Sequence, residues 1–139
     1  MKCSWTWGAF HVGIYLGKNC EGIHEVIDYT DDSEVHRIHL DDFLTSDGSS
    51  SSSSSRSKRH KGGSLGDLYR VRYSGITAKY NPKEVVERAL TEFKRNDFGE
   101  FDAIFNNCEH FVTFCTFGKR FSYQIAKKVN SWWKCNYTL

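Results

Sequence analysis

The spacing of the hydrophobic residues changes along this chain, from every second residue near the N-terminus to a helical repeat after residue 81. Residues 11–17 alternate as a strand with one face on a core does, and the predicted inward residues are Val12, Ile14 and Leu16. Residues 23–29 are predicted to be the hairpin partner of this strand. Shorter strands are predicted at residues 35–40 and 68–73.

Three helices are predicted in the second half of the chain. The first begins at Asn81, which forms a capping box with Glu84, and runs to about residue 95. The second begins at Asn107 and ends at Gly118, and the third covers about residues 121–133.

Strands that precede helices, rather than alternating with them, indicate an α+β fold. We therefore expect one domain over residues 1–139, in which an antiparallel sheet of about four strands packs against about three helices. Residues 47–64 interrupt the pattern, because a serine run, a basic cluster and paired glycines have almost nothing to bury. They are predicted to form a flexible surface loop.

Charge and cysteine content exclude several classes of protein. The chain has 19 basic and 17 acidic residues, and its basic cluster holds Arg56, Lys58, Arg59 and Lys61. The rest of the chain is therefore slightly acidic, which gives no support for nucleic-acid binding by the folded part. No apolar run is long enough for a transmembrane segment, and no secretory signal is visible. The five cysteines include no CxxC pair, so a reducing compartment is expected.

Cys108 has the sequence context of a reactive cysteine. It is predicted to lie in the first turn of a helix, beside the asparagine cap Asn107. Unpaired amides and the helix dipole stabilise a thiolate there, and the same amides are suited to receive an oxyanion. The alternative is an inert buried cysteine, which is the commoner case.

A nucleophilic cysteine needs a base, and His11 is the candidate because a strand holds it. A further polar group is needed to fix the tautomer of the histidine, and His24 is the candidate for this orienting role. If the hairpin turns at Lys18–Asn19, His24 lies opposite Gly13, about 7 Å from His11 on the same face. A slip of one residue would move it to the other face.

The run Asn107-Cys108-Glu109-His110-Phe111-Val112, together with a strand of the form His-x-Gly-Ile-Tyr-x-Gly at His11, resembles the lecithin:retinol acyltransferase-like superfamily, also called H-box/NC proteins. This superfamily includes the vertebrate phospholipase A/acyltransferases and nonstructural proteins of several picornaviruses. The resemblance implies a permuted papain-like architecture of the NlpC type. Further matches are Tyr69-Arg70-Val71, Tyr80-Asn81-Pro82 and Arg88-Ala89.

The resemblance implies a reaction as well. In the family the cysteine attacks an acyl ester, such as a phospholipid, and carries the acyl group as a thioester that passes to water, an amine or a hydroxyl. Cys108 would be the nucleophile, His11 the base and His24 the orienting residue, although His24 lies one position further along than is usual. Within the motif, Glu109 is interpreted as a capping residue and His110 as a structural one. No cofactor is implied.

Departures from the cellular enzymes favour the viral branch of the family. Only ten residues precede His11, and the serine-rich insertion is unusual. The expected setting is therefore a viral nonstructural protein in the host cytoplasm, peripheral to a membrane or nuclear. Two functions stay open: a thiol acyltransferase or phospholipase-like enzyme, and a catalytically silent module that binds host or viral proteins, RNA or membranes.

Other features have two interpretations each. The basic cluster within residues 56–61 suits nuclear import or RNA contact, or only solvates the loop. The basic, tryptophan-bearing helix at residues 121–133 suits an anionic membrane surface, or packs its aromatic residues on the core. No metal site is expected, because the available cysteines and histidines lack zinc-site spacing; the residues considered are Cys108, His110, Cys115, His36 and His39.

Overall fold

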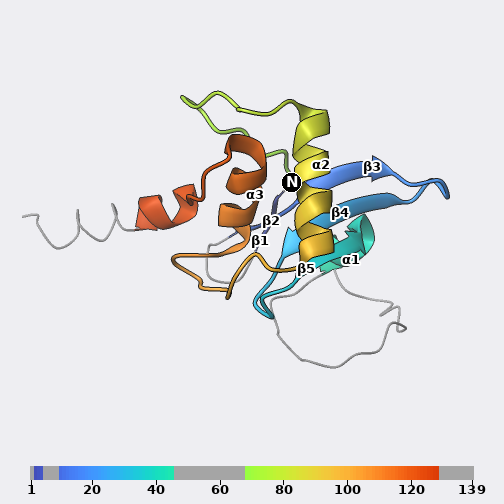
Figure 1. Ribbon diagram of the computed structural model, residues 1–139, viewed down its shortest axis with the longest axis horizontal. Helices are drawn as coiled ribbons and strands as arrows, with labels where there is room; N and C mark the ends of the chain where they lie inside the picture. The colour runs from blue at the N-terminus through green and yellow to red at the C-terminus, as the bar shows by residue number, and fades with distance from the viewer. Residues whose placement is uncertain (1, 5–9, 46–67, 129–139) are drawn as a thin grey trace, which may run out of the picture.

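The computed structural model describes residues 2–4, 10–45 and 68–128. Five strands precede the two longer helices, in an α+β arrangement (Figure 1). The strands are β1 (Lys2–Ser4), β2 (Phe10–Val12), β3 (Ile14–Lys18), β4 (His24–Tyr29) and β5 (Val35–His39). The helices are α1 (Leu40–Thr45), α2 (Pro82–Arg95) and α3 (Cys108–Phe117).

The strands form two antiparallel sheets. One contains β1 and β2, and the other has the order β3-β4-β5. The single strand expected over residues 11–17 is divided at Gly13, between β2 and β3. A Cβ atom on Gly13 would lie 2.7 Å from Val26 Cγ1 and 2.9 Å from the carbonyl oxygen of Ile27, so only glycine fits where the chain passes from one sheet to the other.

The main hydrophobic core lies between the three-stranded sheet and the helices α2 and α3. Its fully buried members include Ile27 and Tyr29 on β4, Ala89 on α2 and Phe111 on α3. A second cluster covers the opposite face of the sheet, where Phe43 of α1 packs against Val26. Because successive residues of β4 point to opposite faces, both faces of this strand are buried.

The predicted helix starts of α2 and α3 are confirmed. Asn81 caps α2, and its side chain exchanges hydrogen bonds with Glu84 in a capping box. Asn107 caps α3, and Gly118 ends it in the left-handed conformation that a residue with a Cβ atom rarely adopts. Both helices therefore begin and end where the sequence signals place them.

Three local expectations differ from the structure. Residues 68–73 form no named strand in the described part of the chain, and the predicted strand at residues 35–40 ends at His39, where α1 takes over. The last predicted helix starts at residue 123 rather than 121, and its described part ends at residue 128. The serine-rich loop lies outside the described residues, and the permuted papain-like relationship stays a prediction.

Candidate active site

Cys108 is the first residue of α3, as the sequence predicts. The Asn107 side-chain oxygen accepts hydrogen bonds from the amides of Glu109 and His110, at 2.9 and 3.3 Å. Of these first three helical amides, that of Cys108 alone has no such acceptor among the described contacts. The Cys108 amide is thus placed to meet an oxyanion formed beside its own sulfur.

His11 reaches Cys108 from β2. The Cys108 sulfur lies 4.0 Å from the carbonyl oxygen of Phe10, the residue before His11. The His11 ring is 4% exposed, and Phe43 of α1 packs against it with a 5.0 Å separation of ring centroids. The structure therefore brings together the two residues that the sequence selected as nucleophile and base, although 97 positions separate them.

A buried carboxylate holds the His11 ring. His11 Nε2 lies 2.6 Å from Asp28 Oδ2, and Asp28 is 2% exposed. Since a carboxylate can only accept, Nε2 carries the proton and Nδ1 is left as the nitrogen that can take a proton from the thiol. Asp28 Oδ1 is also buried and accepts no hydrogen bond from the described part of the chain.

These contacts favour the protonated form of His11. Burial lowers the pKa of His11, but the hydrogen bonds to Asp28 and Cys108 and the nearby negative charge outweigh it, so the pKa rises from 6.5 to about 10. A histidine in this state stabilises a thiolate beside it as an ion pair.

The structure places His24 away from the position that the orienting role requires. His24 pairs with Lys18 rather than lying opposite Gly13. The hairpin turn spans residues 19–23, and the register shifts between Tyr15 and Gly17. The His24 ring stacks on Tyr15 and shares a 2.6 Å hydrogen bond with its hydroxyl, on an exposed part of the hairpin.

The position expected for His24 is occupied by Asp28 instead. Ile14 pairs with Ile27, so the next position on each strand places Asp28 opposite Gly13. The Asp28 carboxylate contacts the His11 ring at 2.6 Å, which is what the sequence argument required of the orienting residue. The sequence did offer a signal, because Asp28 stands between the hydrophobic residues Ile27 and Tyr29 of β4.

A cavity of about 350 Å³ opens beside the pair, with a mainly apolar lining. Both His11 and Cys108 line it, so a substrate carbonyl group in the cavity has access to the sulfur. Apolar lining residues include Phe101, Ala103 and Ile125. The arrangement suits the acyl part of an ester.

Of Glu109 and His110 in the motif, only Glu109 has a different role from the one expected. Glu109 does not cap: its buried carboxylate accepts hydrogen bonds from the Ser122 hydroxyl and, at 3.0 Å, from the Gln124 amide. His110 is structural, as interpreted, and completes the capping box by accepting from the Asn107 amide at 3.1 Å. Burial lowers the pKa of His110, which favours the neutral ring that this contact needs.

Through Gln124, Glu109 makes a second connection between α3 and the strand that carries His11. The side chain of Gln124 clamps the backbone of Phe10: Oε1 accepts from its amide at 2.6 Å, and Nε2 donates to its carbonyl oxygen at 3.0 Å. Sequence analysis missed Gln124, because nothing in its local context distinguishes it from a surface glutamine.

The other cysteines of the described chain differ from Cys108. Cys115 is fully buried on α3, and burial raises its pKa to about 12, whereas Cys20 is exposed on the hairpin turn. Neither of them lines the cavity beside His11. Of the three cysteines whose side chains the structure describes, Cys108 is the one that lines the cavity and lies beside a histidine.

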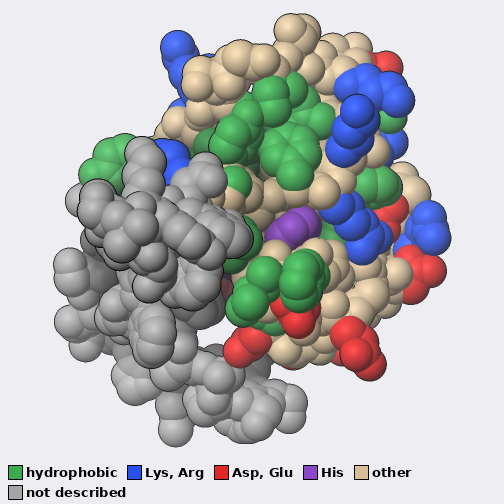
Figure 2. Space-filling view, turned by 90° about the vertical axis from the view of Figure 1, so that its left-hand side faces the viewer, with side chains coloured by type: hydrophobic (Ala, Val, Ile, Leu, Met, Phe, Trp, Pro, Cys, Tyr) green, Lys and Arg blue, Asp and Glu red, His purple; other side chains and the backbone are tan. Residues whose placement is uncertain are grey.

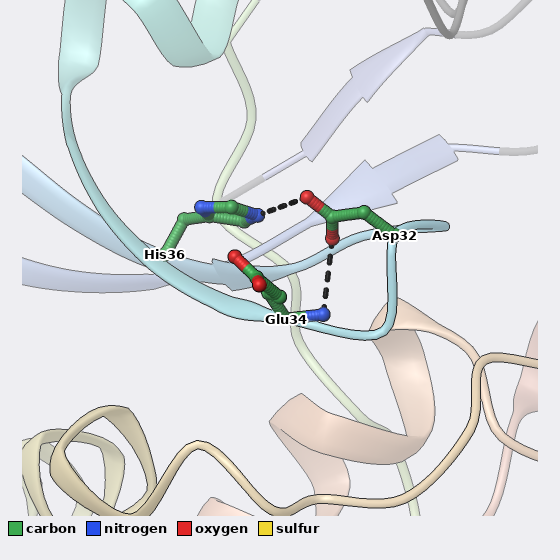
Figure 3. Close-up of side chains that lie close together, drawn as sticks. All are labelled: Asp32, Glu34 and His36. Atoms are coloured by element: carbon green, nitrogen blue, oxygen red, sulfur yellow. Dashed lines mark hydrogen bonds and ion pairs between the residues drawn. The ribbon is translucent and has the colours of Figure 1, made fainter. Parts of the chain in front are cut away.

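One group of side chains has the donor types of a metal site. Asp32, Glu34 and His36 place their ligand atoms within 4.8 Å of one another at the β4–β5 turn (Figure 3). Hydrogen bonds within the turn account for the arrangement: Asp32 accepts from the Glu34 amide at 3.0 Å and lies 2.7 Å from His36 Nε2. Such exposed groups are common without a metal, and the zinc ligand set weighed from the sequence does not gather here.

Two other expectations concern surfaces. The basic cluster of residues 56–61 lies outside the described residues. Within the described ranges, no helix has the length and hydrophobicity that crossing a bilayer requires.

One comparison with known proteins gives a match. A family model described as lecithin retinol acyltransferase matches residues 7–121, which include His11, Asp28 and Cys108. Neither the curated proteins nor the solved structures contain a match to this chain. The match covers most of the sequence, and the chain belongs to the lecithin retinol acyltransferase family.

Proposed function

We propose that this protein is a thiol acyltransferase or acyl hydrolase that carries an acyl group as a thioester on Cys108. The observation that carries the proposal is the buried His11–Asp28 pair beside Cys108, at the end of an apolar cavity. Family membership supports an acyltransferase or phospholipase-like activity. The substrate class is an acyl ester, such as a phospholipid.

In the first half-reaction, the Cys108 thiolate, paired with protonated His11, attacks the ester carbonyl carbon. The carbonyl oxygen gains the negative charge, for which the Cys108 amide is the nearest helix-end donor. The carbon–oxygen bond of the ester then breaks, and protonated His11 gives its proton to the departing alkoxide. Asp28 acts as a positioning residue that stabilises the imidazolium form in between.

In the second half-reaction, water, an amine or a hydroxyl attacks the thioester carbonyl carbon. His11 accepts the proton of the attacking group, the carbon–sulfur bond breaks, and the thiolate of Cys108 is restored beside protonated His11. Attack by water completes hydrolysis, and attack by an amine or alcohol completes acyl transfer.

The test is to detect the thioester itself. Wild type and Cys108→Ser are incubated with a phospholipid that carries a labelled acyl chain, and the labelled peptide is identified by mass spectrometry. We expect the label on the Cys108 peptide of the wild type and its release by hydroxylamine, which cleaves thioesters. Equal label in the Cys108→Ser variant, or label only on Cys20, would contradict the proposal.

The alternative of a catalytically silent binding module depends on the basic loop and on the C-terminal helix. The loop, and the part of the helix after residue 128, lie outside the described residues. The viral origin, the host-cell location and the binding of host or viral proteins or RNA remain predictions from the sequence.

A further inference from the structure

Two large hydrophobic side chains project from a turn that leads into α3. Ile104 is 52% exposed. Phe105 is 77% exposed, which is the highest value among the large hydrophobic residues that the structure describes. They are adjacent, at the tip of the turn that joins Asp102 to Asn106. No side chain of the described residues buries this pair. Its exposure to water is unfavourable in free energy unless another surface covers it.

Backbone amides of this turn find their acceptors within it. Asp102 and Asn106 exchange two amide-to-carbonyl hydrogen bonds of 3.0 Å. The Asp102 carboxylate accepts from the amides of both Ile104 and Phe105 at 2.8 Å, and these bonds lower the pKa of Asp102. The tip can therefore leave water without stripping hydrogen bonds from the amides of its two apolar residues, which is the condition for entering a lipid layer.

The turn is joined to the candidate active site. Ala103 lines the cavity that contains Cys108, and the carbonyl oxygen of Ala103 accepts a 2.9 Å hydrogen bond from Asn107, the cap of α3. The turn lies on the left-hand side of the molecule in Figure 1, where the chain passes from α2 into α3. Figure 2 views that side, and hydrophobic side chains are exposed on it beside basic and acidic ones.

The charges around the mouth of the cavity do not favour a partner of either sign. The cavity lining includes Lys128 and Asp31, whose charges oppose each other, and the His11 ring, which is paired with Asp28. Because Ile104 and Phe105 project from the turn, a protein partner would need a pocket of matched shape to receive them. A fluid hydrocarbon layer accepts such a tip without a matched surface.

We propose that Ile104 and Phe105 insert into a lipid surface and bring the mouth of the Cys108 cavity to that surface. This inference rests on the proposed function, since an enzyme that acts on bilayer-resident esters needs its cavity at the interface. Attachment depends on burial of the two apolar side chains rather than on charge.

The test uses the full chain with Cys108→Ala, so that binding is measured without turnover. Its co-flotation with phosphatidylcholine vesicles is compared with that of the same chain carrying Ile104→Ser and Phe105→Ser. A matched control is Ile76→Ser, which changes an isoleucine that is 40% exposed and does not line the cavity. Near-ultraviolet circular dichroism verifies that each variant is folded.

We expect binding to plain phosphatidylcholine vesicles that persists at high salt, because screening weakens charge attraction and not apolar burial. The double variant should bind about tenfold more weakly or worse, and Ile76→Ser should bind as its parent does. The proposal is overturned if the parent does not bind, if binding needs phosphatidylserine and disappears at high salt, or if Ile76→Ser loses as much as the double variant. Thioester formation is measured separately, so a failed docking test and a failed catalytic proposal are distinguishable.

Discussion

Asp28 and His11 form a buried pair that connects β4 to β2 at the cysteine. Neither residue is stable alone in this position, because a buried charge without its partner is strongly unfavourable. The 2.6 Å contact leaves His11 Nδ1 as the nitrogen available to Cys108. In the proposed mechanism Asp28 therefore acts on Cys108 through the His11 ring, because no described contact joins the carboxylate to the sulfur.

We predict that Asp28→Asn slows labelling of Cys108 by a thiol-reactive acyl-ester probe about a hundredfold or more. The amide keeps the size of the side chain but removes the negative charge that stabilises the imidazolium ring. The measurement is the labelling rate at neutral pH, with the modified cysteine identified by mass spectrometry.

His24→Gln is the matched control for this prediction. His24 contacts Tyr15 on the exposed hairpin and does not line the Cys108 cavity, so its loss should leave the labelling rate unchanged. If His24→Gln slowed the labelling of Cys108 and Asp28→Asn left the labelling rate unchanged, His24 rather than Asp28 would be the orienting residue.

The same pair predicts a pH dependence of stability. The pKa of His11 in the folded chain, about 10, lies above its ordinary value of 6.5. Burial lowers this pKa, and the Asp28 hydrogen bond, with the other contacts, more than offsets that effect. The stabilisation is therefore fully present below pH 6.5 and is lost as the pH rises through about 10.

We expect Asp28→Asn to reduce the free energy of unfolding in urea by about 3 kcal/mol below pH 6.5, because it leaves a buried imidazolium without its carboxylate. Above pH 10 the ring is neutral in both proteins and the difference should become small. A difference that stays constant across this range would show that the pair does not titrate as described.

At the level of the elements, Gly13 is the point where one strand pattern becomes two strands. At Gly13 the chain passes from β2, which carries His11 beside Cys108, to β3, which pairs with β4. The space for a side chain is filled by Val26, the Ile27 backbone and Phe43 of α1. A missing Cβ atom thus decides how closely α1 and the sheet enclose the His11 ring.

We predict that Gly13→Ala lowers the free energy of unfolding by about 1–3 kcal/mol, as overpacking of a closed core does. Chemical denaturation measures the loss. Combining it with Val26→Ala should not restore the wild-type value, because the Ile27 carbonyl oxygen would still lie 2.9 Å from the new Cβ atom. Unchanged stability of Gly13→Ala would mean that this junction is not closed.

In the whole molecule, residues far apart in sequence fix the strand that holds the base. Gln124 clamps both backbone groups of Phe10, and Glu109 holds the Gln124 amide from the first turn of α3. The strand with His11 and the helix with Cys108 are therefore connected through the C-terminal segment as well as directly.

We predict that Gln124→Ala increases hydrogen exchange at the Phe10 amide, because its acceptor is lost, while exchange in the β4–β5 pair stays as it was. Lys127→Ala, on the same helical segment and exposed, is the control and should change neither. Faster exchange throughout the sheet would indicate general destabilisation rather than loss of the clamp.

Much of the fold was predictable because it depends on local signals. The cap at Asn81, the cap at Asn107 and the stop at Gly118 each act within a few residues, so both helices were placed correctly. The segment at residues 68–73 has the alternation of a strand but takes part in no named one. Tyr69 takes part in a single β-bridge, and whether such a bridge extends into a strand depends on the tertiary structure.

In the candidate site, too, local sequence signals predict some residues and the tertiary structure decides others. The sequence by itself determined that Cys108 stands at a helix start and that His11 lies on a strand, since periodicity and capping settle both. Only the tertiary structure decided that Asp28, rather than His24, holds the His11 ring. The physical reason is strand register. The turn over residues 19–23 and the irregularity between Tyr15 and Gly17 set which residues of β3 and β4 lie opposite each other, and no local pattern in the sequence records that register.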